Sequence, residues 1–282
     1  MLRYKTVTDE GVSVEQITGR PSLYLDQWMW CLLSENIELK NRFIAIGEKV
    51  CPTIMYSFAT LIELALIKDQ EQIEAIINVM DSFDYGFSDA DPSRVIHREQ
   101  KLEVPQGSAF REMNPCCDVE LIKNYVMNVM DPLKPFQIST MLTKLREEGK
   151  SGTYREMGQR FASNLTPTVL KARQDPKALA RAKKRHSKNE LRRKKPPYTQ
   201  DIYRLALDFV VVNETMKMTP NEWIDLLHTV VPVAYFDFVL LDKRWCHFIR
   251  KVLPLKPPDI AQVFSPGDLE KFLKGLLDFK EI

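Results

Sequence analysis

The chain has 282 residues, and its 40 lysines and arginines against 38 aspartates and glutamates give a formal net charge of only +2. Hydrophobic residues make up 44% of it, which is typical of a folded protein and excludes a wholly disordered chain. No apolar run approaches the roughly 20 residues that a membrane helix needs, and the first twenty residues lack the apolar stretch of a secretory signal. The five cysteines fit neither a disulfide framework nor a zinc motif, so we expect a cytoplasmic protein with reduced thiols and no membrane partner.

The charges are placed unevenly along the chain. Between Lys171 and Lys195 there are twelve basic and two acidic residues, which leaves 28 basic and 36 acidic residues elsewhere. A basic arm of this kind can bind a nucleic-acid backbone, because neutralised phosphates release counterions, although a solvated helix or a disordered tail has the same composition. No aromatic residue between Phe161 and Tyr198 is available for stacking on bases. The candidate backbone contacts are Lys183, Lys184, Arg185, Lys188, Arg192 and Arg193.

In chain order, the first predicted element is a short buried strand, Ser22–Asp26, that ends on an acid. A second apolar run over residues 52–57 leads into a helix that Ser57 can cap. Residues from about Tyr85 to Pro115 are polar, contain three prolines and are predicted to be irregular. The predicted helices of this half span residues 27–51 (with a break near Asn36), 58–68 and 71–83.

In the C-terminal third, Thr219 followed by Pro220 predicts the start of a helix, and Pro232 is expected to end it. Residues 238–242 form a second predicted strand that ends on an acid. Strands that alternate with helices predict an α/β fold with a parallel sheet. The other predicted elements are helices over residues 119–130, 138–148, 154–161, 168–193, 199–213, 243–252 and 266–279, and a short strand over residues 261–264.

Two predicted strands end in aspartate, at Asp26 and Asp242. Ligands bind outside the carboxyl ends of strands in an open parallel sheet, so both acids should face one crevice, which the helix acids Glu63 and Asp225 could join. Four close carboxylates repel one another unless a cation lies among them, and Mg²⁺ or Mn²⁺ prefers oxygen ligands. Such a site suits phosphodiester hydrolysis, because a bound metal ion lowers the pKa of water and stabilises charge on phosphate.

Each acid also has a structural interpretation. A strand-terminal aspartate often caps a helix, and Glu63 or Asp225 could be a solvated helix acid. Both helix acids nevertheless lie among apolar neighbours, where a carboxylate needs a partner. His228, three residues after Asp225, could assist a metal or pack in the core, and the Cys116–Cys117 pair could be reactive or simply buried. Phosphate-binding glycine loops are absent, which disfavours a nucleotide-driven motor or a dinucleotide enzyme.

Short motifs around these acids resemble those of PIN-domain ribonucleases. The resemblance covers roughly residues 20–85 and 200–280, and it implies a PIN-like three-layer fold with a central parallel sheet flanked by helices. The nuclease domain would be discontinuous, over residues 20–85 and 200–282, with a mainly helical insertion over residues 86–199 that contains the basic arm 171–195. The motifs that carry the resemblance are Leu23-Tyr24-Leu25-Asp26, Ser57 with Glu63, Asn221–His228, Phe236–Arg244 and Val263–Pro266.

The resemblance implies a metal-dependent endoribonuclease in which Asp26, Glu63, Asp225 and Asp242 are the catalytic acids and hold Mg²⁺ or Mn²⁺. Asn221 would flank the site, and Asp237 would serve as a further acid or, as we favour, a structural residue at the strand edge. The family includes growth-inhibiting toxins and phage-defence effectors, so we expect one of these roles or a role in RNA processing. By the same resemblance, we expect the protein to form a homodimer or to bind a regulatory protein. Two alternatives stay open: a nuclease that acts on DNA, and a non-catalytic module that binds nucleic acid or protein.

Overall fold

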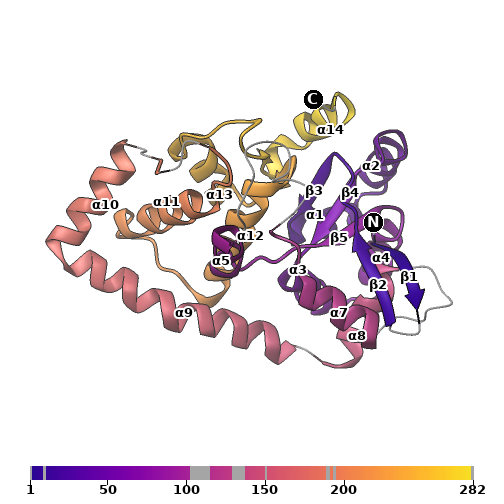
Figure 1. Cartoon of the computed structure of the whole chain (residues 1–282). Coiled ribbons are helices and arrows are strands. Elements are labelled where there is room, and N and C mark those ends of the chain that lie inside the picture. Colours follow the sequence, from indigo (N-terminus) through magenta and orange to yellow (C-terminus); the bar gives the residue numbers. More distant parts are fainter. Residues whose placement is uncertain are drawn as a thin grey trace.

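Five parallel strands form the central sheet of the computed structural model, which describes residues 2–8, 11–101, 115–128, 137–149, 151–188, 191–192 and 195–280 (Figure 1). The order of the strands across the sheet is β5-β4-β3-β6-β7. The chain therefore builds outwards from β3 to β5 and then returns to add β6 and β7 on the other side. Their bounds are β3 (Ser22–Leu25), β4 (Thr53–Tyr56), β5 (Asp84–Phe87), β6 (Phe238–Leu240) and β7 (Gln262–Phe264).

The strand order reverses between β3 and β6, which are direct neighbours in register, with Leu23 opposite Phe238 and Leu25 opposite Leu240. In an open parallel sheet, the crevice for a ligand lies outside the carboxyl ends of the strands at such a reversal. The predicted parallel α/β sheet is confirmed, and its topology marks the ends of β3 and β6 as the place to look for a site.

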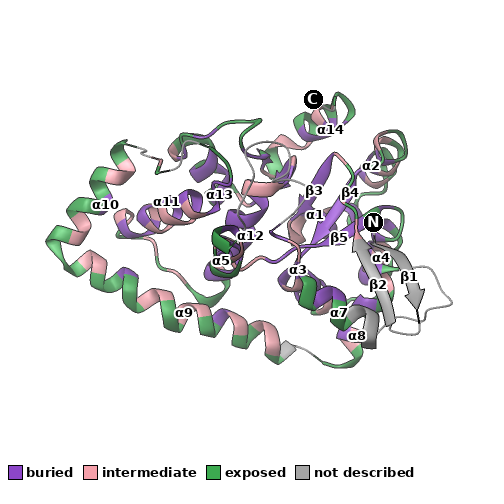
Figure 2. Ribbon diagram, viewed as in Figure 1, coloured by how far each residue is buried: buried purple, intermediate pink, exposed green. Residues whose placement is uncertain are grey.

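Helices cover both faces of the sheet. Because successive side chains of a strand point to opposite faces, Leu23 and Leu25 enter one hydrophobic core and Tyr24 enters the other. The strands of this sheet are buried, as Figure 2 shows in purple for β3 and β4, except for the first residues of β5 and β7, Asp84 and Gln262. The first core is covered by α1 (Gln27–Glu35), α2 (Ile37–Val50), α3 (Phe58–Ala65), α4 (Gln70–Met80), α7 (Val119–Asn128), α8 (Ile138–Glu147) and α14 (Leu269–Leu277).

The second core lies under the other helices. It contains buried residues of α5 (Pro92–Lys101), α9 (Ser151–Gln174), α10 (Pro176–Lys188), α11 (Thr199–Val212), α12 (Pro220–Tyr235), α13 (Lys243–His247) and the π-helical turn η1 (Phe248–Val252). The short 3₁₀ turn η2 (Pro266–Asp268) precedes α14.

The long helix α9 ties the expected insertion to the rest of the chain. It runs along α12, where Trp223 Nε1 donates to Thr166 Oγ1 at 2.9 Å and a Cβ at Gly158 would meet Pro220 and Ile224 at 3.1–3.2 Å. The next helix, α10, folds back over α11 and lies at the end of this helical layer away from the sheet (Figure 1). The helices of residues 151–188 thus share a core with α11 and α12.

Several predicted elements differ from the structure. Residues 84–87 form β5, and α5 begins at Pro92, although residues 85–115 were expected to be irregular. A strand of four residues on the sheet edge is too short to show a periodic pattern. The helix α9 is continuous through Pro167, where two helices were expected.

Pro232 lies inside α12 and does not end it. A proline removes one backbone donor from a helix, and α12 continues because its next turn is anchored: Val233 is buried and Phe236 N donates to Pro232 O at 3.0 Å. An antiparallel hairpin with no counterpart among the predicted elements, β1 (Leu2–Thr8) and β2 (Gly11–Gln16), precedes the sheet. No helix in the described ranges is long and apolar enough to cross a membrane.

Candidate functional site

Asp26 and Asp242 follow the neighbouring strands β3 and β6, so the sheet brings them to the same edge. Both cap helices: Asp26 Oδ1 accepts from Gln27 N at 2.7 Å, and Asp242 Oδ1 accepts from Trp245 N at 2.8 Å. Each cap occupies one carboxylate oxygen, and no described residue donates a hydrogen bond to either Oδ2. The structural and functional interpretations are therefore compatible, since the cap fixes the carboxylate and leaves its second oxygen for a ligand.

Glu63 approaches the same edge from α3, whose N-cap is Ser57 as predicted, with Thr60 N donating to Ser57 Oγ at 3.1 Å. Its side chain is buried, and Oε1 accepts a short hydrogen bond from the hydroxyl of Tyr154 on α9. Oε2 is buried without a hydrogen bond from any described residue and lies 3.6 Å from His228 Nε2. Burial raises the pKa of Glu63 to about 7. A buried carboxylate oxygen without a donor is rare in folded proteins, and this one has its lone pairs available for a ligand.

Asp225 completes the group from α12. Burial, followed by the charges of Asp26, Asp242 and Glu63, raises its pKa to about 8. The pKa of Asp26 is also raised, to about 6, mainly by burial, with Glu63 and Asp242 contributing. The nearby Arg244 guanidinium pairs with Glu222 at 2.6 Å, leaving Asp225 without an ion pair to any residue in the described ranges. The four acids thus form one electrostatically coupled cluster that lacks a full set of countercharges, and we call it the acidic cluster.

His228 is buried in the second core and connects the acidic cluster to β3. Its Nδ1 forms a short hydrogen bond with the hydroxyl of Tyr24, which also bonds Ser57 Oγ at 3.1 Å and Thr60 Oγ1 at 2.9 Å. Burial lowers the pKa of His228, which favours the neutral imidazole. When the Tyr24 hydroxyl donates to Nδ1, the single proton of the neutral ring lies on Nε2 and faces Glu63. This tautomer is inferred from the hydrogen-bond partners. This side chain therefore faces Glu63 in addition to packing in the core.

The donor chemistry of the acidic cluster fits a hard cation. It offers carboxylate oxygens, among them the buried Oε2 of Glu63, and the pKa values of these acids are raised by burial and, at Asp26 and Asp225, also by the neighbouring carboxylates. Within the described ranges, no group of three or more histidine, cysteine, aspartate or glutamate side chains forms a ready-made metal site. Of the acids, Asp26, Glu63, Asp225 and Asp242 are the ones that would hold Mg²⁺ or Mn²⁺.

Of the two expected supporting residues, Asp237 lies at the opposite end of β6 from the acidic cluster, whereas Asn221 lies one helical turn before Asp225 on α12. Asp237 accepts from Ser22 N and Ser22 Oγ, both at 2.9 Å, and pairs with Arg20, so it ties together the start of β3 and the segment before β6. This is the structural role that we favoured for it. Asn221 is exposed in the first turn of α12 and makes no hydrogen bond with the described residues that would place it in the site.

Two residues near this edge of the sheet were missed from the sequence. Tyr154 contacts Glu63 across ninety-one positions, and no local pattern marks it. Asp89 follows β5 and is fully buried, but its oxygens pair with Arg94 and Arg98, both at 2.7 Å. Because its charge is compensated by two arginines, Asp89 has a structural role. An acid at the end of a strand is therefore not enough, by itself, to predict a residue of the functional site.

The structure separates the residues of the basic arm by role. Arg185 forms a bidentate ion pair with Asp208, at 2.6 and 2.7 Å, so its guanidinium is committed to holding α10 on α11. Lys183 lies 3.6 Å from Glu214, and Arg192 lines a cavity beside α9 and α11. Lys184 and Lys188 are exposed and form no ion pair with a described residue, whereas Arg193 lies outside the described residues.

The cysteine pair is unsuited to nucleophilic chemistry. Burial raises the pKa of Cys116 well above its usual value and that of Cys117 to about 11, so both thiols stay protonated at neutral pH. The interpretation as buried thiols, the plainer of the two that the sequence allowed, agrees with this.

Comparison with known proteins identifies no family or function for this chain. No protein-family model, no curated protein and no solved structure matches this chain.

Proposed function

We propose that this protein is a metal-dependent nuclease that hydrolyses phosphodiester bonds, with RNA as its substrate. The observation that carries the proposal is the buried Oε2 of Glu63, which accepts no hydrogen bond from a described residue, within four coupled carboxylates at the reversal point of a parallel sheet. The resemblance of the surrounding motifs to PIN-domain ribonucleases supports the same chemistry, and it alone suggests a role as a toxin or phage-defence effector.

In this proposal, each acid has a role that follows from its contacts. Asp26 and Asp242 are fixed by their helix caps, so their free oxygens need no reorganisation to meet a cation. Glu63 is oriented by its hydrogen bond from Tyr154 and faces His228. Asp225 has the most strongly raised pKa of the four, so its negative charge is the most costly one in the absence of a metal ion. A bound Mg²⁺ or Mn²⁺ would lower the pKa of water and stabilise charge on the phosphate.

The purified protein should cleave single-stranded RNA when Mn²⁺ or Mg²⁺ is present and should leave it intact in EDTA. A fluorescently end-labelled RNA and the matching DNA, resolved on denaturing gels, measure the cleavage. DNA cleavage at an equal or higher rate would assign the enzyme to DNA instead. Cleavage of RNA that persists in EDTA would exclude the proposed metal mechanism, and no cleavage of either would favour a non-catalytic module.

A stripe of basic residues on α10 is the proposed contact for the nucleic-acid backbone. The spacing of these residues, four, three and four positions, places them on one face of the helix, and all are exposed without an ion pair to a described residue. We call them the α10 stripe: Lys177, Arg181, Lys184 and Lys188.

Replacing all four residues of the α10 stripe with glutamine should weaken RNA binding and reduce its salt dependence. The slope of log affinity against log salt should fall by roughly 0.7 for each phosphate of a single strand that the variant no longer neutralises. Fluorescence anisotropy at several salt concentrations, with the inactive Asp225→Asn background to prevent cleavage, measures the slope. A matched control replaces four exposed lysines that lie outside α10, namely Lys49, Lys68, Lys271 and Lys274. If the slope of the stripe variant equalled that of the control, the α10 stripe would not contact phosphate.

A further inference from the structure

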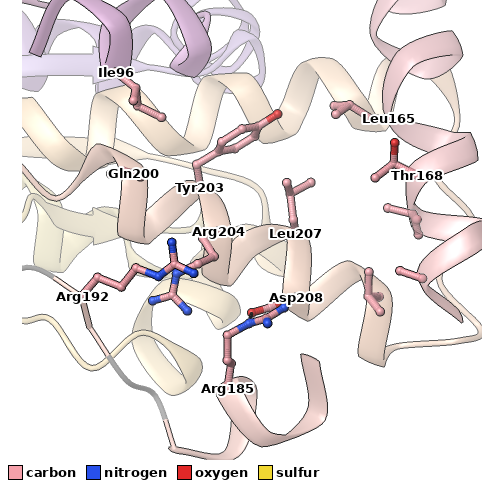
Figure 3. A pocket seen from close by; sticks show the side chains of 13 residues that line it. Ile96, Leu165, Thr168, Arg185, Arg192, Gln200, Tyr203, Arg204, Leu207 and Asp208 are labelled. Atoms are coloured by element: carbon pink, nitrogen blue, oxygen red, sulfur yellow. Dashed lines mark hydrogen bonds and ion pairs between the residues drawn. The ribbon is translucent and has the colours of Figure 1, made fainter. Parts of the chain in front are cut away.

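A cavity of about 420 Å³ lies between α9, α10 and α11 on the side of the sheet that holds the second core, with Arg192 among its lining residues. Its size is that of a pocket for a small organic ligand. Figure 3 shows the space enclosed by side chains from α9, with Leu165 and Thr168, and from α11, with Tyr203 and Leu207. None of its lining residues belongs to the acidic cluster, so it is a separate feature of the fold.

The lining has two chemically different parts. One wall is apolar and comes mainly from the facing sides of α9 and α11. Its members are Ile96, Leu165, Val169, Ala172, Leu207 and Val211. The other part gathers three arginines, Arg185, Arg192 and Arg204, and Arg192 and Arg204 reach toward each other in Figure 3. A ligand that fills the cavity would meet an apolar surface and cationic groups.

Of the three arginines that line the cavity, Arg192 is the one whose guanidinium has no acidic partner among the described residues. Asp208 compensates Arg185, and the buried carboxylate of Asp201 pairs with Arg204 at 3.0 Å. The same Asp201 carboxylate accepts from Arg192 N at 3.1 and 3.2 Å, which fixes the backbone of Arg192 at the rim. The guanidinium of Arg192 forms no hydrogen bond or ion pair with any residue in the described ranges. A positioned, uncompensated guanidinium beside another one favours an anion between or beside them.

We propose that this cavity binds a small amphipathic anion, a carboxylate or phosphate on an apolar body, with the anionic group held at Arg192 and the apolar body against α9 and α11. The paired Arg185 and Asp208 form a neutral, polar part of the wall. A highly polar ligand would leave the apolar wall without a contact, and an uncharged one would leave Arg192 unused.

Two fluorescent probes separate the charge from the apolar contact. Anilinonaphthalene sulfonate is an apolar anion, and phenylnaphthylamine has the same rings without the sulfonate. Arg192→Gln should weaken binding of the sulfonate about fivefold, the expected worth of one exposed ion pair, and leave the uncharged probe unaffected. The matched control is Arg181→Gln, which removes an exposed arginine from α10 that does not line the cavity.

A second variant tests the location independently of charge. Thr168 is an exposed residue that lines the cavity, so Thr168→Trp should narrow it without disturbing the core and should weaken both probes. Circular dichroism confirms that each variant is folded. Decanoate and decyl phosphate should displace the sulfonate probe, and the stronger competitor identifies the preferred anionic group. Equal displacement by decanol, sulfonate binding unchanged in Arg192→Gln, or probe binding unchanged in Thr168→Trp would overturn the proposal.

Discussion

Asp225→Asn should make the metal-free protein more stable than the wild type at high pH and leave the two equally stable near pH 4. The folded protein holds the pKa of Asp225 at about 8, whereas an unfolded aspartate titrates near 4. A raised pKa contributes stability that is fully present below the unfolded value and is lost as pH rises through the folded value. The wild type should therefore lose stability steadily between about pH 4 and pH 8, and asparagine, which carries no charge, should avoid that loss.

The expected size of this effect is large for a single substitution. Asp225 is half-buried and coupled to its neighbours, so we expect a gain of about 2–3 kcal/mol for the variant above pH 8, which corresponds to roughly 5 °C in Tm for a chain of this length. Thermal unfolding in EDTA from pH 4 to pH 9 measures it. Glu74→Gln, which removes the charge of an exposed acid on α4 outside the acidic cluster, is the control. An Asp225→Asn curve parallel to that of the wild type would show that Asp225 is not held in a charge-deficient cluster.

Asp26→Asn and Asp242→Asn should each reduce the metal-dependent cleavage of RNA on the order of 100-fold or more while leaving the fold intact. Asparagine caps a helix about as well as aspartate, so the caps on α1 and α13 persist and only the charge is lost. Initial rates at saturating Mn²⁺ and thermal unfolding of the same samples separate activity from stability.

Asp69→Asn provides a closely matched control for these two variants. Asp69 caps α4 in the same manner, with Oδ1 accepting from Gln72 N at 3.0 Å, but it lies outside the acidic cluster. Its variant should keep wild-type activity. If all three variants retained full activity, Asp26 and Asp242 would have only the structural role of helix caps.

The sequence was sufficient for the parts of the fold that local patterns encode. The buried strand before Asp26, the cap at Ser57 and the capping of α12 by Thr219 all follow from neighbouring residues, and each is confirmed. The parallel sheet followed from the alternation of strands and helices. Its topology then brings Asp26 and Asp242 to one edge, which is why an argument from strand ends could find the acids.

The sequence was insufficient where contacts between distant segments decide the structure. Pro232 reads locally as a helix stop, yet the burial of α12 carries the helix past it. Tyr154 reaches Glu63 only because α9 packs along α12 and α3. Arg185 looks like a free cation in a basic run, and only the fold places Asp208 opposite it. In each case, the deciding partner lies too far away in the sequence to leave a periodic signal.

Calorimetric titration of Mn²⁺ into the protein at pH 7, repeated in buffers of different ionisation enthalpy, tests the metal site most directly. Because the pKa values of Glu63 and Asp225 are raised to about 7 and 8, metal binding must displace protons from them. We predict saturable binding with release of roughly one to two protons, and an Asp225→Asn variant that binds more weakly and releases fewer. Mn²⁺ binding without proton release, or unchanged in Asp225→Asn and Glu63→Gln, would contradict a metal site in the acidic cluster.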